Sequence, residues 1–208
     1  MSSGEVSGGG TTRVVKALGT PDPRQSAPSG VWGMALFLCA EVALFGTLIG
    51  SYFYLESSDK SWPPHGIDRP EVLLPVLATA YLLLTLVPIH LAARASRRGE
   101  RGRTVTAIAV GLICQCGYLA WQIVLFTDDL HKFSPRQTAY GSIYFTLLAV
   151  HHAHVLLGLT LDLALIWQVT AKGLSRYWLI AVRNLALYWY VVGALAVFVL
   201  FTQISPSL

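Results

Sequence analysis

The chain has 208 residues, of which 54% are hydrophobic and only 12% are charged. A soluble domain usually carries about 25% charged residues, so this composition argues against a soluble protein and favours a chain that lies largely in lipid. The formal net charge of +4 could indicate nucleic-acid binding. Because nearly all the charges lie between apolar segments, a membrane protein is expected and a nucleic-acid partner is not.

The chain opens with a segment that differs from the rest. Residues 1–29 are rich in Gly, Ser, Thr and Pro, a composition that cannot bury a core and predicts a disordered tail. The segment is not expected to be a signal peptide, because the first apolar run starts late and no small-residue cleavage pattern follows it. A membrane domain is predicted over residues 30–208.

Five apolar segments reach the length of a membrane span, which is about 20 residues for a hydrocarbon core of roughly 30 Å. They cover residues 31–55, 72–93, 104–127, 139–170 and 179–203. Strands of a membrane barrel would alternate in polarity over about ten residues, which these segments do not. Only helices and closed barrels satisfy their backbone polar groups in lipid. The sequence therefore predicts an all-α integral membrane bundle of five transmembrane helices.

The basic residues are distributed unevenly between the two ends of this bundle. Eleven lie in the tail, around the second connection and around the fourth connection, and they are Arg13, Lys16, Arg24, Arg94, Arg97, Arg98, Arg101, Arg103, Lys172, Arg176 and Arg183. Four lie at the other end, and they are Lys60, Arg69, Lys132 and Arg136. Cytoplasmic loops carry the excess of Lys and Arg, so the N-terminus is predicted in the cytoplasm and the C-terminus outside. We expect a multi-pass protein of the bacterial cell (inner) membrane.

Glu41 is an acid within the first apolar segment. It lies roughly 15 Å into the predicted helix at 1.5 Å per residue, where an ionised carboxylate costs at least ~3 kcal/mol. Its neighbours at helical spacing are apolar, so the acid either stays protonated or meets a partner from another helix, water or lipid. A purely structural hydrogen bond is one interpretation. A role in proton handling or subunit contact is the other, and it is favoured because acids inside membranes are usually functional.

The fourth segment contains a polar stripe. At 100° per residue, Tyr144, Gly158 and Asp162 fall within about 20° of His151, and His154 falls about 60° away. Such a stripe with a glycine suits close contact and hydrogen bonding with another helix. A shorter polar stripe in the third segment consists of Gln115, Tyr118 and Gln122.

Three histidines within residues 151–154 suggest a metal or haem site, but the pattern is incomplete. A closed site needs third and fourth donors, and the remaining histidines, His65, His90 and His131, are not at the same depth. No metal site and no catalytic residue is therefore predicted. The cysteines are expected to be small buried side chains, because "CQC" lacks the two-residue spacer of a redox or zinc motif.

The motifs "GMALFLCAEVALFGTLIGSYF", "WPPHGI", "YGSIYFTLLAVHHAHVLLGL" and "YWY" follow one another along the chain. In this order and spacing they resemble subunit III of the haem–copper respiratory oxidases. "GMALFLCAEVALFGTLIGSYF" is similar to the family's helix with a buried glutamate, which maps onto Glu41. "WPPHGI" reproduces the family's Trp-Pro-Pro-x-Gly loop, with residues Trp62, Pro63, Pro64 and Gly66.

The other two motifs lie in the last two apolar segments. "YGSIYFTLLAVHHAHVLLGL" is similar to the family's YGS-to-HxxHV-x-x-G segment, with its histidines at His151 and His154. "YWY" begins with Tyr188 and Trp189 where the family usually reads Tyr-Trp-His. Two departures are that Tyr190 replaces this histidine and that Arg183 stands where an acid is expected.

The resemblance covers residues 30–204 and implies the short, five-helix form of the family. It implies an accessory subunit of a cytochrome c oxidase that binds no redox cofactor itself and supports the stability and proton uptake of the catalytic subunit. The implied partners are catalytic subunit I with its haem and copper, subunit II, further subunits, membrane lipids and a bound phospholipid. The arginine-rich residues 94–103 would meet anionic headgroups.

Two alternatives stay open at this point. The same scaffold occurs in quinol oxidases and beside nitric oxide reductases. A more distant alternative is a self-standing proton transporter that uses Glu41 and the polar stripe of the fourth segment.

Overall fold

The structure is a computed structural model, and it describes residues 29–67, 70–172 and 176–207. Its helices are α2 (Ser29–Ser58), α3 (Leu73–Arg97), α4 (Arg101–Lys132), α5 (Ala139–Lys172), α6 (Arg176–Ile204) and the short 3-10 helix η1 (Ser205–Ser207). Five of them are long and apolar enough to cross a membrane, and the described ranges contain no strand. The predicted all-α bundle of five spans is therefore confirmed. The predicted tail, apart from Ser29, lies outside the described residues.

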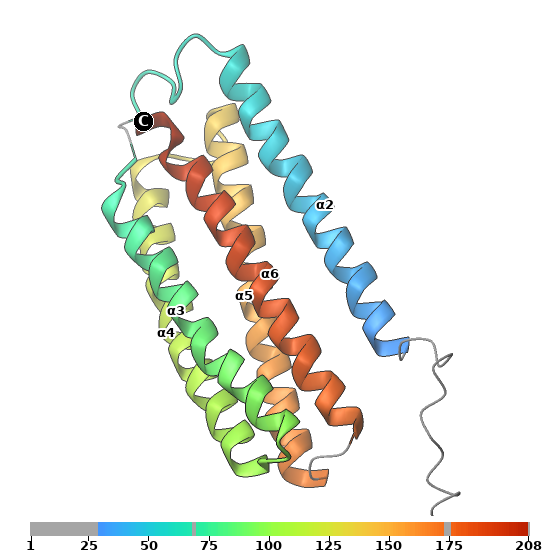
Figure 1. The fold of residues 1–208 in the computed structure, drawn as a ribbon. Helices are drawn as coiled ribbons and strands as arrows, with labels where there is room; N and C mark the ends of the chain where they lie inside the picture. The colour runs from blue at the N-terminus through green and yellow to red at the C-terminus, as the bar shows by residue number, and fades with distance from the viewer. Residues whose placement is uncertain (1–28, 68–69, 173–175, 208) are drawn as a thin grey trace, which may run out of the picture.

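Four helices form a closed bundle and the fifth lies beside it. α3 contacts α4 and α6, and α5 contacts the same two helices, so each of the four has two neighbours. Among the described helices, α2 packs against α5 and α6 alone, along the outside of the bundle (Figure 1). One end of the bundle carries the α2–α3 loop and the C-terminus, and we name it the α2–α3 end. The other carries the turn between α3 and α4, and we name it the α3–α4 end.

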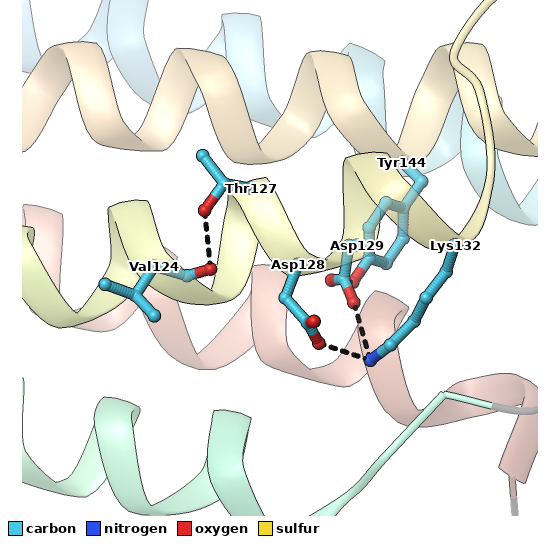
Figure 2. Close-up of polar contacts among 6 residues, drawn as sticks. All are labelled: Val124, Thr127, Asp128, Asp129, Lys132 and Tyr144. Carbon is cyan, nitrogen blue, oxygen red and sulfur yellow. Dashed lines mark hydrogen bonds and ion pairs between the residues drawn. The ribbon is translucent and has the colours of Figure 1, made fainter.

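The helices run past the apolar segments that predict them. α4 continues to Lys132, whose Nζ lies 2.6 Å from Asp128 Oδ2 and 3.6 Å from Asp129 Oδ1. Figure 2 shows these three charged side chains on the last turns of the helix. Charged side chains three and four residues apart face each other on a helix and stabilise it. The charges that mark the end of the apolar segment thus extend the helix.

The turn between α3 and α4 is short because of Gly99, which has a φ of +73°. The Gly99 N–H donates to Ser96 O, and the Glu100 N–H donates to Ala95 O. These two bonds satisfy carbonyls at the end of α3 in the Schellman pattern, which favours glycine at this position. α4 then begins at Arg101, so the two helices pack as antiparallel neighbours.

Large aromatic side chains fill the α2–α3 end. Tyr52 and Tyr140 are almost fully buried there. Trp62, from the Trp-Pro-Pro loop, donates from Nε1 to Tyr52 Oη over 2.9 Å and meets the Tyr140 ring edge-on at 5.0 Å between centroids. The loop motif therefore closes this end of the fold. Tyr52 Oη also lies 3.0 Å from Ser205 Oγ, which ties α2 to the C-terminal end of the chain.

The three cysteines are free, and the expectation that they are buried is wrong. Cys39 and Cys116 are exposed on the surface of the protein, and Cys114 is partly buried. Cys39 belongs to α2, which lies outside the closed bundle, and Cys116 faces outward from α4. An apolar sequence context places a residue within the membrane but does not decide whether it faces lipid or protein.

Candidate functional site

The acid in the first span meets a histidine from another helix. Glu41 of α2 and His154 of α5 are in contact through Oε2 and Nε2, and their side chains are 15% and 12% exposed. The other ring nitrogen of His154, Nδ1, lies 2.7 Å from the carbonyl oxygen of Val150. Of the partners considered for Glu41, another helix is the one that the structure provides.

These contacts determine how many protons the Glu41–His154 pair holds. A carbonyl oxygen only accepts hydrogen bonds, so Nδ1 of His154 carries a proton and donates it to Val150. Nε2 then either accepts a proton from a protonated Glu41, or it is itself protonated and donates to the carboxylate. In both states one proton lies between the two residues and the pair is neutral overall. A neutral pair avoids the cost of placing a net charge in the membrane.

The pair lies where three helices meet. Phe45 of α2 packs against the His154 ring at 5.2 Å between centroids and 68° between planes. Tyr188 of α6 donates from its hydroxyl to the His154 carbonyl oxygen over 2.7 Å, and Phe37 stacks on Tyr188 at 6.3 Å. Aromatic rings thus limit the access of water to the pair without enclosing it fully.

A second acid, Asp162 of α5, is fully buried inside the closed bundle. Trp189 of α6 donates from Nε1 to both carboxylate oxygens, at 3.2 and 3.3 Å. Gln115 of α4, in the amide orientation that satisfies both of its groups, donates to Asp162 Oδ2 over 2.8 Å. Gly158 makes room for the indole, because a Cβ atom there would lie 2.5 Å from Trp189 Cζ2. Asp162 therefore connects three helices through hydrogen bonds.

His151 belongs to a third group, between α5 and α4. Its Nε2 lies 3.1 Å from Tyr118 Oη, which also accepts a hydrogen bond of 2.8 Å from Gln122. His151 Nδ1 and His152 Nε2 are buried and have no hydrogen-bond partner within the described chain. The His152 ring packs edge-on against Phe126, with ring centroids 5.5 Å apart.

Tyr144 belongs to a fourth group, near the α2–α3 end. Its hydroxyl donates to Asp129 Oδ2 of α4 over 2.7 Å. In Figure 2 the tyrosine comes from α5 and reaches the acid beside Lys132. Lys132 lies close to the other carboxylate oxygen of Asp129, so this group combines a tyrosine, two acids and a lysine.

The polar stripe expected on α5 is thus divided among its neighbours. His154 faces α2, His151 and Tyr144 face α4, and Asp162 faces both α4 and α6. Tyr188 and Trp189 of the "YWY" motif are fully buried within the chain's own helices.

Sequence reasoning missed two of the contacting residues. Asp129 lies two residues beyond the predicted segment 104–127, but it belongs to α4 and its carboxylate accepts a hydrogen bond from Tyr144. Tyr52 was treated as part of an apolar run although its hydroxyl joins Trp62 and Ser205. Helical spacing signals Asp129, because it lies i+7 from Gln122, on the polar face of α4.

Within the described parts of the chain, no group of three or more His, Cys, Asp or Glu side chains is placed to hold a metal ion. The three histidines of α5 meet different partners. The arrangement can hold and exchange protons at the Glu41–His154 pair and can fix helix positions through hydrogen bonds.

The family model described as cytochrome c oxidase subunit III matches residues 25–205, which include all five spans. The chain belongs to the cytochrome c oxidase subunit III family. The Glu41–His154 pair and the Asp162 group both lie within the range that this subunit III family model matches.

Individual relatives cover most of the same region. The chain is 27% identical to the cytochrome bo(3) ubiquinol oxidase subunit 3 of Pseudomonas aeruginosa over 72% of each chain. It is 27% identical to the cytochrome c oxidase subunit 3 of Bacillus subtilis, over 80% of this chain and 81% of the relative. It is 30% identical to the cytochrome c oxidase subunit 3 of a Synechocystis species, over 74% of this chain and 63% of that protein. Subunits III of quinol and cytochrome c oxidases are thus similarly close to it.

Proposed function

We propose that this chain is an accessory subunit III of a haem–copper terminal oxidase that reduces oxygen to water and pumps protons in aerobic respiration. The observation that carries the proposal is the family match along the whole membrane-spanning part of the chain. The redox chemistry belongs to haem and copper in the partner subunits, and this chain supports their stability and proton uptake. It is an integral, multi-pass membrane protein.

The proposed partners are the catalytic subunit I, subunit II and membrane lipids, in the bacterial cell membrane. The excess of basic residues at the α3–α4 end supports an N-terminus in the cytoplasm. α2 offers a surface for either partner subunits or lipids, because among the described helices it contacts α5 and α6 alone and leaves large apolar side chains exposed along its length, such as Trp32, Leu36 and Val42.

The proposed role of Glu41 follows from its contact with His154. The pair can pass its shared proton between a carboxyl and an imidazole without changing its net charge, which suits a group that exchanges protons at the edge of a larger proton-uptake system. Because the pair is partly accessible, water or a group from the partner can reach it. Asp162, His151 and Tyr144 are proposed to hold the helices in register.

Affinity purification of the tagged full-length chain in mild detergent tests the function. The expected result is co-elution of a catalytic subunit, with haem absorption in the complex. The subunit separated from that complex should lack a haem Soret band. Recovery of the tagged chain without any haem-bearing partner would contradict the proposal.

The electron donor needs a separate measurement, because the relatives include both quinol and cytochrome c oxidase subunits. We propose cytochrome c as the donor. Oxygen uptake by the purified complex should be fast with reduced cytochrome c and slow with a reduced quinol. The opposite preference would place the subunit in a quinol oxidase, and nitric oxide consumption without oxygen uptake would place it beside a nitric oxide reductase.

A self-standing proton transporter would use the same Glu41–His154 pair and therefore needs its own test. Liposomes that contain only this chain and a pH-sensitive dye should show no proton flux above that of empty liposomes. Flux that disappears in the Glu41→Gln variant would support the transporter instead.

A further inference from the structure

A cavity enters the closed bundle at the α2–α3 end. It offers about 40 Å³ of space to molecules of the size of water, and all four helices of the closed bundle contribute to its lining. Its polar lining side chains are Glu71, Gln122, Asp128, Asp129, Lys132, Tyr144, His152 and Gln203. Neither the Glu41–His154 pair nor Asp162 is among the lining residues. The cavity is therefore separate from the two acids inside the membrane.

The mouth of the cavity carries more negative than positive charge. Asp128 and Lys132, on the last turns of α4, are exposed, and Asp129 beside them is partly buried (Figure 2). Glu71, which is exposed, adds a third acid from the residues before α3. α5 contributes the neutral hydroxyl of Tyr144, and α6 contributes the neutral Gln203. Three acids and one lysine at an entrance open to water favour a cation, including a proton, over an anion.

His152 lies at the inner end of the cavity. It follows Tyr144 by eight residues on α5, which places it about 12 Å deeper in the membrane at 1.5 Å per residue. The residue lines the cavity, and its Nε2 is buried without a hydrogen-bond partner in the described chain. Leaving such a nitrogen unpaired costs about 1–3 kcal/mol. A partner for Nε2 is therefore expected from within the cavity.

The size and polarity of the cavity suit water. One water molecule needs about 10–15 Å³ of such space, so 40 Å³ has room for about two or three. A buried water also needs polar partners, since apolar cavities stay dry. Gln122 and Gln203, both buried, provide such partners together with Tyr144 and His152. Three waters, joined to each other and to both ends by hydrogen bonds of about 2.8 Å, span roughly 11 Å, which matches the depth of His152.

We propose that this cavity binds a chain of about two or three water molecules, through which His152 exchanges protons with the aqueous phase at the α2–α3 end. A carboxylate, a water molecule and an imidazole can each take up and release a proton, so Asp129, the water chain and His152 form a continuous path. His152 is then a second protonation site of the chain, besides the Glu41–His154 pair. It faces the outer phase in the orientation proposed above, and only this assignment of sides rests on the proposed function.

The neighbouring His151 provides a contrast within the same helix. It is fully buried, its Nε2 lies 3.1 Å from Tyr118 Oη, and it does not line the cavity. Its Nδ1, like Nε2 of His152, has no hydrogen-bond partner in the described chain. The two rings thus share their chemistry and nearly their depth, and they differ in access to the cavity.

Hydrogen–deuterium exchange at Cε1 of the histidine rings tests the proposal, because this exchange requires a ring to take up a proton and then to meet hydroxide. The full chain in its detergent-purified complex is incubated in deuterated buffer, and tandem mass spectrometry locates the label. His131, which is exposed near the end of α4, is the positive control. We expect His152 to exchange within about tenfold of the His131 rate and at least about tenfold faster than His151.

A substitution that fills the cavity tests the route of the water. Leu148 lines the cavity and is buried, so Leu148→Phe places a larger side chain there and should slow exchange at His152 about fivefold or more. Leu156→Phe is the matched control, because Leu156 lies on the same helix, is 57% exposed and does not line the cavity. It should change the exchange rate of His152 less than about twofold.

Three outcomes would overturn the proposal. Exchange at neither His151 nor His152 would show that the cavity is dry, and equal exchange at both would show that the whole helix opens to water. Equal rates at His152 in the two leucine variants would show that water arrives by another route. If Leu148→Phe fails to fold, the comparison of the two histidines in the unsubstituted chain decides. Co-elution of the haem-bearing partner should be unchanged in both variants, which separates this test from that of the proposed function.

Discussion

Replacing Gly158 by alanine should destabilise the bundle through Trp189. The new Cβ atom would lie 2.5 Å from Cζ2 and 2.8 Å from Cη2 of the indole, whereas carbon atoms pack at about 3.5–4.0 Å. The ring must therefore move by about 1 Å. That movement costs about 1–3 kcal/mol in overpacking. It also carries Nε1 away from the two oxygens of Asp162, now at 3.2 and 3.3 Å.

The net effect includes two further contributions. A lost hydrogen bond between membrane helices costs about 0.6–1.7 kcal/mol, and alanine favours a helix over glycine by about 1 kcal/mol. The free energy of unfolding should therefore fall by about 1–3 kcal/mol. Titration of the purified chain from a mild detergent into sodium dodecyl sulfate, followed by tryptophan fluorescence, measures this value.

The matched control is Gly46→Ala on α2, where a Cβ atom would have no neighbour within 4 Å. This variant gains helix propensity alone and should be unchanged or stabilised by up to about 1 kcal/mol. In a Trp189→Phe background the clash with Gly158→Ala should largely vanish, because phenylalanine lacks the outer indole atoms, and a double-mutant cycle reports the coupling. Equal stability of the Gly158→Ala and Gly46→Ala variants would refute the reasoning.

Three other substitutions test the polar groups. Glu41→Gln keeps a hydrogen bond to the neighbouring imidazole but cannot carry the shared proton, so the complex should assemble while carbodiimide labelling of the subunit disappears; full labelling of the variant would show that another acid reacts. Asp162→Leu should lower the free energy of unfolding by about 1–3 kcal/mol, because it leaves the Trp189 N–H buried without a partner. Asp162→Asn keeps an acceptor for that N–H and should lower the free energy of unfolding by less than half as much in the same detergent titration. Tyr118→Phe removes the partner of His151 Nε2 and should lower the unfolding free energy by about 0.6–1.7 kcal/mol; an unchanged value would mean that water replaces the hydroxyl.

The spans were predictable because their physical cause is local. A segment of apolar side chains long enough to cross lipid must satisfy its backbone internally, so its length and composition determine that it is a helix. The residues at which the helices end were less predictable. α4 extends to Lys132 because Asp128 and Lys132 pair along the helix, and α3 extends to Arg97 because basic side chains favour a helix C-terminus. Charged residues end the predicted apolar segments, although at these two ends they belong to the helix.

The polar residues were predictable as a set, but their partners were not. Helical spacing places His151 and Asp162 on one face of α5, and the structure has both buried in the closed bundle. Which helix each one meets depends on the packing order of the whole bundle. A separation of about 60° between His151 and His154 on the helix is enough to direct the second toward α2, on a different side of α5 from α4.

The Glu41–His154 pair also explains how an outer helix with few polar groups keeps one orientation. α2 presents apolar side chains on nearly all sides, so apolarity alone does not decide which of its faces packs against α5 and α6. A rotation by one residue, about 100°, would move Glu41 from His154 into lipid, at a cost of at least ~3 kcal/mol. It would also leave a buried imidazole nitrogen without a partner. The Glu41–His154 contact, together with the Tyr52–Ser205 contact at the α2–α3 end, therefore fixes which face of α2 meets the bundle and which face stays exposed, as buried polar residues do when they set the register of paired helices.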